Sequence, residues 1–349
     1  MFEFLKRRGH GPIGLDIGAR WVKLVQFADQ GRKLVDAARA EITIAGEELT
    51  AEELRLAIEK ARQGRSFVGR DVVVCLSDRQ LFLQNLRVPK SPPAEMDRLV
   101  MQEAAGRLPF RMEETELRYL EAADVRQLET LLREVIVLGC HRPVLDQLLN
   151  TIEQAGLRPR AVDVEPLALL RSGCLQLRRE ADAGKRTLFT HVGYRRTIAI
   201  VAQDDAPLMI KTIDLGGKHL DEAVAAHLQM DLASAAGLRR HHSDRRSEQQ
   251  DPEVSRSVAE AVRPVIDRLA NELSLCNRYQ SVTFRGQPLS SVVLGGGEAS
   301  PGLQEAIHGL LEIKCDLSDP FRALSTVPNA ARRGQWDIAA GLALREIAA

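Results

Sequence analysis

The sequence predicts an α/β protein made of two related halves with a cleft between them. Two observations support this fold class. Residues 14–27 and residues 188–201 share one pattern, in which an apolar stretch ends at a glycine turn and a second apolar stretch follows. Another apolar stretch, 292–294, stops at Gly295, Gly296 and Gly297. Because glycine has no Cβ, its backbone N–H groups can approach a phosphate or a base closely. The sequence therefore predicts a nucleotide cleft.

Length and composition exclude several classes of protein. A chain of 349 residues is long enough for more than one domain. Lys plus Arg and Asp plus Glu number 48 each, and aromatic residues make up only 4% of the chain, so neither charge nor stacking favours nucleic acid. No apolar stretch approaches the ~20 residues of a membrane-spanning helix. Five irregularly spaced cysteines indicate buried thiols in a reducing compartment. We expect a cytoplasmic protein that binds no nucleic acid.

The first half is expected to alternate between strands and amphipathic helices. A β-meander fills the first fifty or so residues, and the capping signature at Thr50 and Glu53 predicts the start of a helix. The expected strands are 14–17, 21–27, 34–44, 71–76, 81–88, 118–124 and 134–139, and the expected helices are 50–62, 94–108 and 143–155.

The second half is expected to repeat the strand–glycine turn–strand theme. A hairpin over 187–201 leads to a strand at 208–215 and a helix at 219–229. The polar stretch 238–253 is expected to be a mobile loop. The remaining expected elements are a long helix at 254–279, a strand at 291–294 and helices at 303–311 and 338–347.

Six segments resemble the PilM family, the cytoplasmic actin-like proteins of type IV pilus assembly, which are related in fold to the cell-division protein FtsA. The turn at 108–110 and the VDVEP stretch at 162–166 separate this resemblance from sugar kinases, which share only the glycine turns. The resemblance covers nearly the whole chain. The segments that carry it are 14–18 with 22–23, 103–110, 162–168, 215–218, 294–297 with 301–303, and 340–345.

The resemblance implies an actin-like fold, duplicated in the manner of ribonuclease H, with an inserted subdomain of the FtsA type called 1C. The implied boundaries are 1–85, 160–183 and 331–349 for subdomain 1A, 86–159 for subdomain 1C, 184–218 and 285–330 for subdomain 2A, and 219–284 for subdomain 2B.

The resemblance further implies a scaffold at the inner membrane face of a type IV pilus or related secretion platform. Such a scaffold binds the cytoplasmic tail of a PilN-like inner-membrane protein in a groove between 1A and 1C, contacts other platform proteins, and reaches the membrane through these partners. Two alternatives remain. A sugar or acetate kinase needs a catalytic carboxylate near the second hairpin and a large substrate-binding insert. An FtsA-like filament protein needs a basic amphipathic C-terminal helix, whereas this sequence stops at Ala349.

The family also implies ATP with Mg²⁺ in the cleft. Asp16 is the metal-binding residue that the resemblance implies, and no residue is assigned a catalytic role. The residues implied to bind the cofactor are Asp16, Gly18 and Lys23 in the first hairpin, Gly193 in the second, Gly216, Gly217 and Lys218 in the next turn, and Gly295, Gly296 and Gly297 near the adenosine.

This sequence departs from the family pattern in the first phosphate hairpin. Where the family has serines after the glycine, this chain has Ala19, Arg20 and Trp21. Three small hydroxyl positions are therefore lost, although Asp16 and Lys23 are kept.

The second hairpin departs further. His191 replaces the family's aspartate, and imidazole is a poor partner for a hard cation such as Mg²⁺. Tyr194, Arg195 and Arg196 replace small residues. Either the arginines clamp phosphates in a modified site, or the cleft is closed and they lie on a surface. Nothing in the sequence supplies an orienting carboxylate for His191, and we expect a weak or inactive ATPase.

Overall fold

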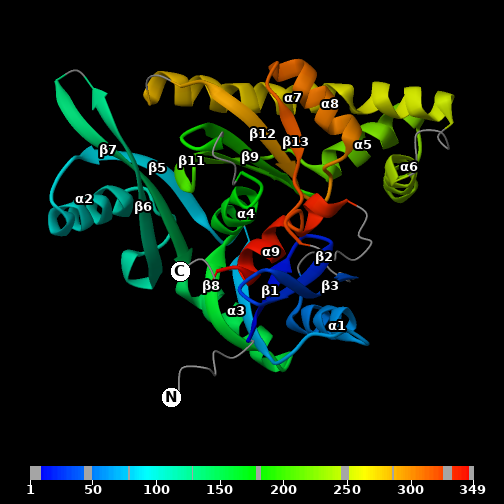
Figure 1. The fold of residues 1–349 in the computed structure, drawn as a ribbon, viewed down its shortest axis with the longest axis horizontal. Helices are drawn as coiled ribbons and strands as arrows, with labels where there is room; N and C mark the ends of the chain where they lie inside the picture. The colour runs from blue at the N-terminus through cyan, green and yellow to red at the C-terminus, as the bar shows by residue number, and fades with distance from the viewer. Residues whose placement is uncertain are drawn as a thin grey trace.

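The computed structural model describes residues 9–42, 49–77, 79–127, 129–177, 182–244, 251–284, 287–324 and 332–345. Figure 1 shows two sheets stacked one above the other, with the long helix α7 along the top and a smaller lobe at the left. None of the helices in these ranges is long and apolar enough to cross a membrane.

Two five-stranded sheets repeat one topology, with strand orders β3-β2-β1-β4-β8 and β11-β10-β9-β12-β13. In each, three antiparallel strands come first, and two further strands join in parallel. This repeat confirms the predicted duplication. The first sheet contains β1 (His10–Ile17), β2 (Trp21–Ala28), β3 (Lys33–Glu41), β4 (Asp71–Leu76) and β8 (Arg158–Val164). The second contains β9 (Arg186–Val192), β10 (Thr197–Gln203), β11 (Ala206–Ile213), β12 (Leu289–Gly295) and β13 (Cys315–Leu317).

A third sheet, with strand order β5-β7-β6, forms the lobe and is called the insert below. It consists of β5 (Phe82–Pro89), β6 (Thr115–Gln127) and β7 (Thr130–His141), and one of its faces packs on α2 (Pro93–Ala105). Its other face turns toward the body, because Ile136 and Leu138 share a core with residues of both halves.

The helix after the insert belongs to the first sheet. Leu148 and Ile152 of α3 (Arg142–Gln154) pack in one core with Ile13 and Val72. We therefore propose to bound the insert at 82–141 rather than at the expected 86–159, since the wider range removes part of the 1A core.

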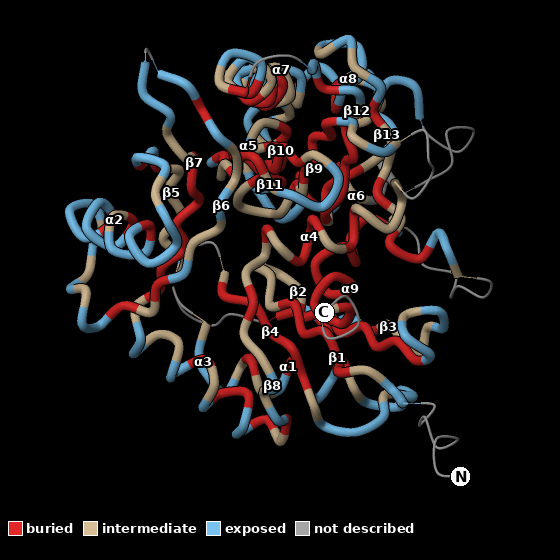
Figure 2. Tube along the Cα trace, turned by 60° about the vertical axis from the view of Figure 1, so that its left-hand side comes forward, coloured by how far each residue is buried: buried red, intermediate tan, exposed pale blue. Residues whose placement is uncertain are grey.

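The helices cover the sheets as the apolar periodicity predicts. Thr50 caps α1 (Ala51–Arg62) in a complete capping box with Glu53, as expected. In Figure 2 the central strands and α9 are buried, while the insert's helix α2 is largely exposed. The remaining helices are α4 (Glu165–Cys174), α5 (Gly217–Leu228), α6 (Leu232–Asp244), α7 (Pro252–Thr283), α8 (Pro301–Leu311) and α9 (Asp337–Ala343).

The expected mobile loop at 238–253 is a wrong prediction over its described part. Residues 232–244 form α6, α7 begins at Pro252, and 245–250 lie outside the described residues. The basic composition suggested solvent, but the side chain of Arg239 is buried between two carboxylates. Those carboxylates come from distant segments, so the local sequence could not reveal them.

Candidate functional site

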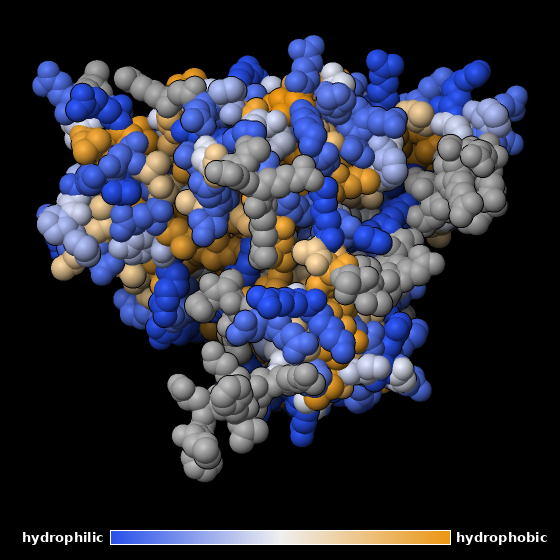
Figure 3. Space-filling model, viewed as in Figure 1, coloured by the Kyte–Doolittle hydropathy of each residue, from blue (hydrophilic) through white to orange (hydrophobic). Residues whose placement is uncertain are grey.

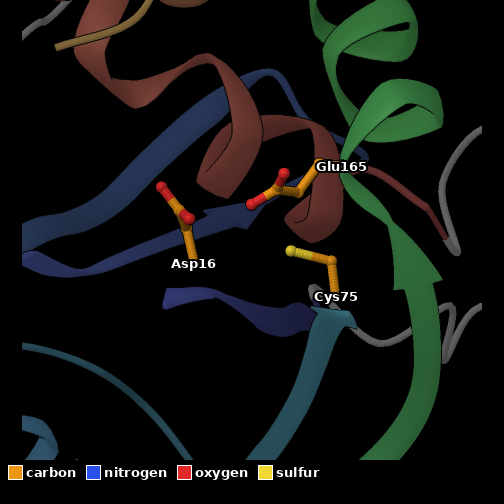
Figure 4. Close-up of side chains that lie close together, drawn as sticks. All are labelled: Asp16, Cys75 and Glu165. Carbon is orange, nitrogen blue, oxygen red and sulfur yellow. The ribbon is translucent and has the colours of Figure 1, made fainter. Parts of the chain in front are cut away.

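A cluster of acidic side chains lies where the two halves meet (Figure 4). Asp16 at the end of β1, Cys75 in β4 and Glu165 at the start of α4 point toward one another, with their possible ligand atoms all within 4.8 Å. The two carboxylates are the hard oxygen ligands that Mg²⁺ prefers. Burial, followed by the charges of Glu165 and Asp16, raises the pKa of Cys75 well above its usual value, so the thiol stays protonated and is a poor ligand.

Lys23 neutralises this cluster from within the protein. Its Nζ donates to Asp16 Oδ2 at 2.8 Å, and both side chains are buried. Burial alone would lower the pKa of Lys23, but Asp16, and then Asp337 and Glu165, outweigh it and raise that pKa. The cluster can accept a Mg²⁺ ion through Asp16 and Glu165, but only in competition with the buried ammonium.

The second hairpin presents a histidine–carboxylate pair. His191 Nδ1 donates to Asp337 at 2.8 Å, and Asp337 is fully buried at the start of α9. Asp337 also accepts from the N–H of Ile338 at 2.7 Å. The expectation that His191 lacks an orienting carboxylate is therefore wrong. The partner lies 146 positions away along the chain, which is why the sequence did not suggest it.

Backbone N–H groups at the start of α5 are hydrogen-bonded to carbonyls of the protein itself. The N–H of Gly217 donates to the carbonyl of Gly193 at 3.0 Å, and the N–H of Lys218 donates to the carbonyl of Tyr194 at 2.7 Å. A helix N-terminus can bind a phosphate only through unsatisfied N–H groups. These two donors instead tie α5 to the second hairpin, beside Gly216. The Lys218 ammonium lies 3.5 Å from Glu222, on a half-exposed helix face.

The glycine triplet has a similar structural role at two of its three positions. A Cβ at Gly295 would overlap the Asp337 carboxylate, and Gly296 has a φ of +97° with the backbone of Val192 against it. Gly297 has open space beside it, so it is the triplet member best placed to approach a ligand.

The first and second hairpins contact each other through an arginine–aromatic stack. The guanidinium of Arg20 lies 4.6 Å from the ring centre of Tyr194, and that of Arg240 lies 5.8 Å from it. Gly18, at the turn of the first hairpin, donates its N–H to the carbonyl of Trp21 at 3.0 Å. The stack therefore joins the first half to α6 of the second half across the junction of the halves.

A buried ion-pair network lies behind this stack. Arg239 donates to Asp221 at 2.7 Å and to Glu298 at 2.8 Å, and Arg240 donates to Asp221 at 2.6 Å. Glu298 also fills the space beside Gly217, where a Cβ would overlap its carboxylate. We call Arg20, Tyr194, Asp221, Arg239, Arg240 and Glu298 the cleft network.

Family membership decides among the function classes. A family model described as type IV pilus assembly protein PilM matches residues 14–347. The chain belongs to this family. It is also similar to a solved structure described as the PilM–PilN type IV pilus biogenesis complex, with 25% identity, a TM-score of 0.76, and coverage of 97% of this chain and 99% of that chain. The ethanolamine utilization protein EutJ from Carboxydothermus hydrogenoformans matches with 14% identity and a TM-score of 0.55, over 96% of this chain and 89% of that chain.

PilM membership confirms the actin-like fold and favours the scaffold over the kinase and the FtsA-like filament. Within this fold Lys23 pairs with Asp16 near Asp337, and Gly295 of the second half packs against the Asp337 carboxylate, so these residues come together at the junction of the halves. Gly193 lies in the second hairpin, where its carbonyl accepts from Gly217. Arg196, which the sequence offered as a phosphate clamp, pairs instead with the exposed Asp214 at 2.8 Å.

Sequence reasoning missed several residues of this PilM-family site. Glu165 stood inside the VDVEP segment, and the glutamate directly after the glycine triplet, Glu298, was also visible. Asp221, Arg239 and Asp337 carry no local signal, because each acquires its partners from another element.

Proposed function

We propose that this protein is a scaffold of a type IV pilus assembly platform that holds the cytoplasmic tail of a PilN-like inner-membrane protein. Membership of the PilM family and similarity to a structure described as a PilM–PilN complex support this proposal. Through such a tail the protein would sit at the cytoplasmic face of the inner membrane and would meet the other platform proteins there.

The recess between the insert and the first half is the tail site that we propose. Leu120 and Ala122 of β6 in the insert, and Val164 and Leu167 at the end of β8 and the start of α4, pack against one shared apolar core, and all four are only partly buried. Figure 3 shows apolar surface in the hollow between the lobe and the body. A preformed apolar groove with pockets for alternate side chains suits an extended peptide.

We expect the cytoplasmic tail of a PilN-like single-span membrane protein to bind with micromolar affinity, about −8 kcal/mol. Leu120→Asp places a charge in the recess and is expected to weaken binding at least tenfold, as measured by isothermal titration calorimetry. Leu310→Asp, on α8 and 50% exposed, is the matched control and should bind like the unaltered chain. If titration of the tail into the unaltered protein released or absorbed no heat, the scaffold proposal would be contradicted.

We further propose that nucleotide binding is weak and that ATP hydrolysis is negligible. Hydrolysis needs Mg²⁺ bridging phosphate oxygens and an ordered attacking water. Here the Lys23 ammonium already pairs with the Asp16 carboxylate. His191 stands at the position where the family pattern has the second carboxylate. The cleft network supports this proposal, since a nucleotide would have to part Arg20 from Tyr194.

The expected result is no release of phosphate above buffer over several hours, with or without Mg²⁺. If a nucleotide binds despite this, Arg20→Ala should raise its affinity by removing the stack, measured by displacement of a fluorescent ATP analogue. Steady turnover that requires Mg²⁺ and disappears in Asp16→Ala would contradict the proposal.

A further inference from the structure

A groove of about 1070 Å³ lies on the opposite side of the insert from its α2 face. Residues of β5, of β11 and of the C-terminal half of α7 line it, so the insert and the second half both contribute. The recess proposed for the tail lies instead against β6, β8 and α4. Of these two sites, only the recess lies between the insert and the first half.

Two strand edges border the groove. In the sheets of the described residues, β5 pairs only with β7 and β11 pairs only with β10, so each is a terminal strand. They approach without pairing, and the side-chain amide of Asn85 spans the gap to the carbonyl of Ile210 at 3.0 Å. Terminal strands carry unpaired N–H and C=O groups, which are a template for an added strand.

The insert is held in place at one end of this groove. Glu134 of β7 is 1% exposed, accepts from Tyr279 of α7 at 2.5 Å and accepts from Arg87 at 2.7 Å. Removing either donor would leave a buried carboxylate with fewer partners. The two walls are therefore fixed relative to each other, and the groove is preformed.

The lining combines apolar and cationic side chains. Val282 and Leu275 on α7 are 80% and 43% exposed, so their apolar side chains are open to a partner. Arg87, Lys211 and Arg278 line the same groove, and among the described residues no carboxylate does so. Glu134 and Glu272 pair with Arg87 and Lys211 from outside the lining. The lining therefore has a positive surplus, carried by Arg278.

We propose that this groove binds an extended, acidic and apolar peptide segment of a partner protein, as a second docking site separate from the tail recess. The partner's apolar side chains would cover Val282 and Leu275, and its carboxylates would face the cations. In an extended strand that alternates apolar and acidic residues, each kind recurs at every second residue, and the two kinds point to opposite faces.

The probe is a fluorescein-labelled peptide of about eight residues that alternates glutamate and valine, titrated in fluorescence anisotropy against the full chain. At low salt we expect saturable binding with a dissociation constant on the order of 100 µM. Arg278→Glu and Val282→Asp should each weaken it at least fivefold, and added salt should weaken it as well. Val282 is too exposed for the change to disturb folding.

Leu310→Asp is the control and should leave binding unchanged. A peptide with lysine in place of glutamate should not bind. Binding that is absent up to millimolar protein, that is equal for the lysine peptide, or that is unaffected by Val282→Asp overturns the proposal. Displacement by the PilN-like tail would mean a single site and would also overturn it. Because Val282→Asp leaves the recess untouched, it should not change tail binding, so failure of one site is distinguishable from failure of the other.

Discussion

Arg239→Met is expected to lower the free energy of unfolding by about 3–5 kcal/mol, the usual cost of breaking a buried ion pair. The Arg239 side chain is 7% exposed and bridges Asp221 and Glu298, whose side chains are 0% and 7% exposed. Burial opposes the charge of Arg239, but Glu298 and Asp221 outweigh it and raise its pKa. Without the arginine, two carboxylates remain buried close to each other. Urea denaturation followed by circular dichroism measures the change.

The same variant should show a characteristic pH dependence. Burial already raises the pKa of Asp221 despite Arg239, and loss of the arginine should raise it further. An acid with a raised folded-state pKa binds more protons in the folded state, so stability falls as the pH rises through that pKa. The deficit of Arg239→Met should therefore shrink on going from neutral to mildly acidic buffer. A deficit that grows on acidification would contradict the role of Asp221.

Two further variants serve as controls. Arg196→Met removes a guanidinium that is 35% exposed and paired with Asp214, which is 83% exposed, and such a surface pair is worth about 0–1 kcal/mol. Adding Glu298→Gln to Arg239→Met should recover part of the loss by removing one buried charge. A loss below about 1 kcal/mol for Arg239→Met itself would show that the buried pairs with Asp221 and Glu298 do not stabilise the second half.

Gly341→Ala is expected to destabilise the protein by about 3 kcal/mol or more, at the upper end of overpacking effects. α9 crosses α4 at Gly341, where a Cβ would overlap the carbonyl oxygen of Ala168. On its other side α9 meets β1 at Gly14, where a Cβ would overlap the carbonyl of Ala339. The helix is held between two backbones and cannot move away from one without striking the other.

Thermal unfolding monitored by circular dichroism measures this effect. Gly309→Ala is the matched control, since Gly309 lies in helix α8 with nothing within 4 Å of its added Cβ. Alanine there should be neutral or stabilise the protein by up to ~1 kcal/mol, because it restricts the unfolded chain and favours the helix. A melting temperature for Gly341→Ala equal to that of Gly309→Ala would disprove the close packing of α9.

Local signals in the sequence determined much of this fold. The strand–turn–strand pattern at 14–27 and 188–201 predicted the duplicated sheets, and the capping signature at Thr50 placed the start of α1. Period-two and period-3.6 patterns depend only on near neighbours, which explains why they could be read directly. The short strand β13, at an edge, was missed because three residues carry too little periodicity.

The tertiary structure alone decided the state of the cleft. The sequence showed that Arg20, His191 and Tyr194 were unusual but not whether they formed a phosphate clamp or closed the site. The structure gives Arg20 and His191 partners from distant elements, Tyr194 and Asp337 respectively. It likewise places Arg239 between Asp221 and Glu298. Burial of a charge is favourable only when a partner is supplied in the right geometry. Such partners are set by how sheets and helices pack, and no local pattern in the chain encodes them.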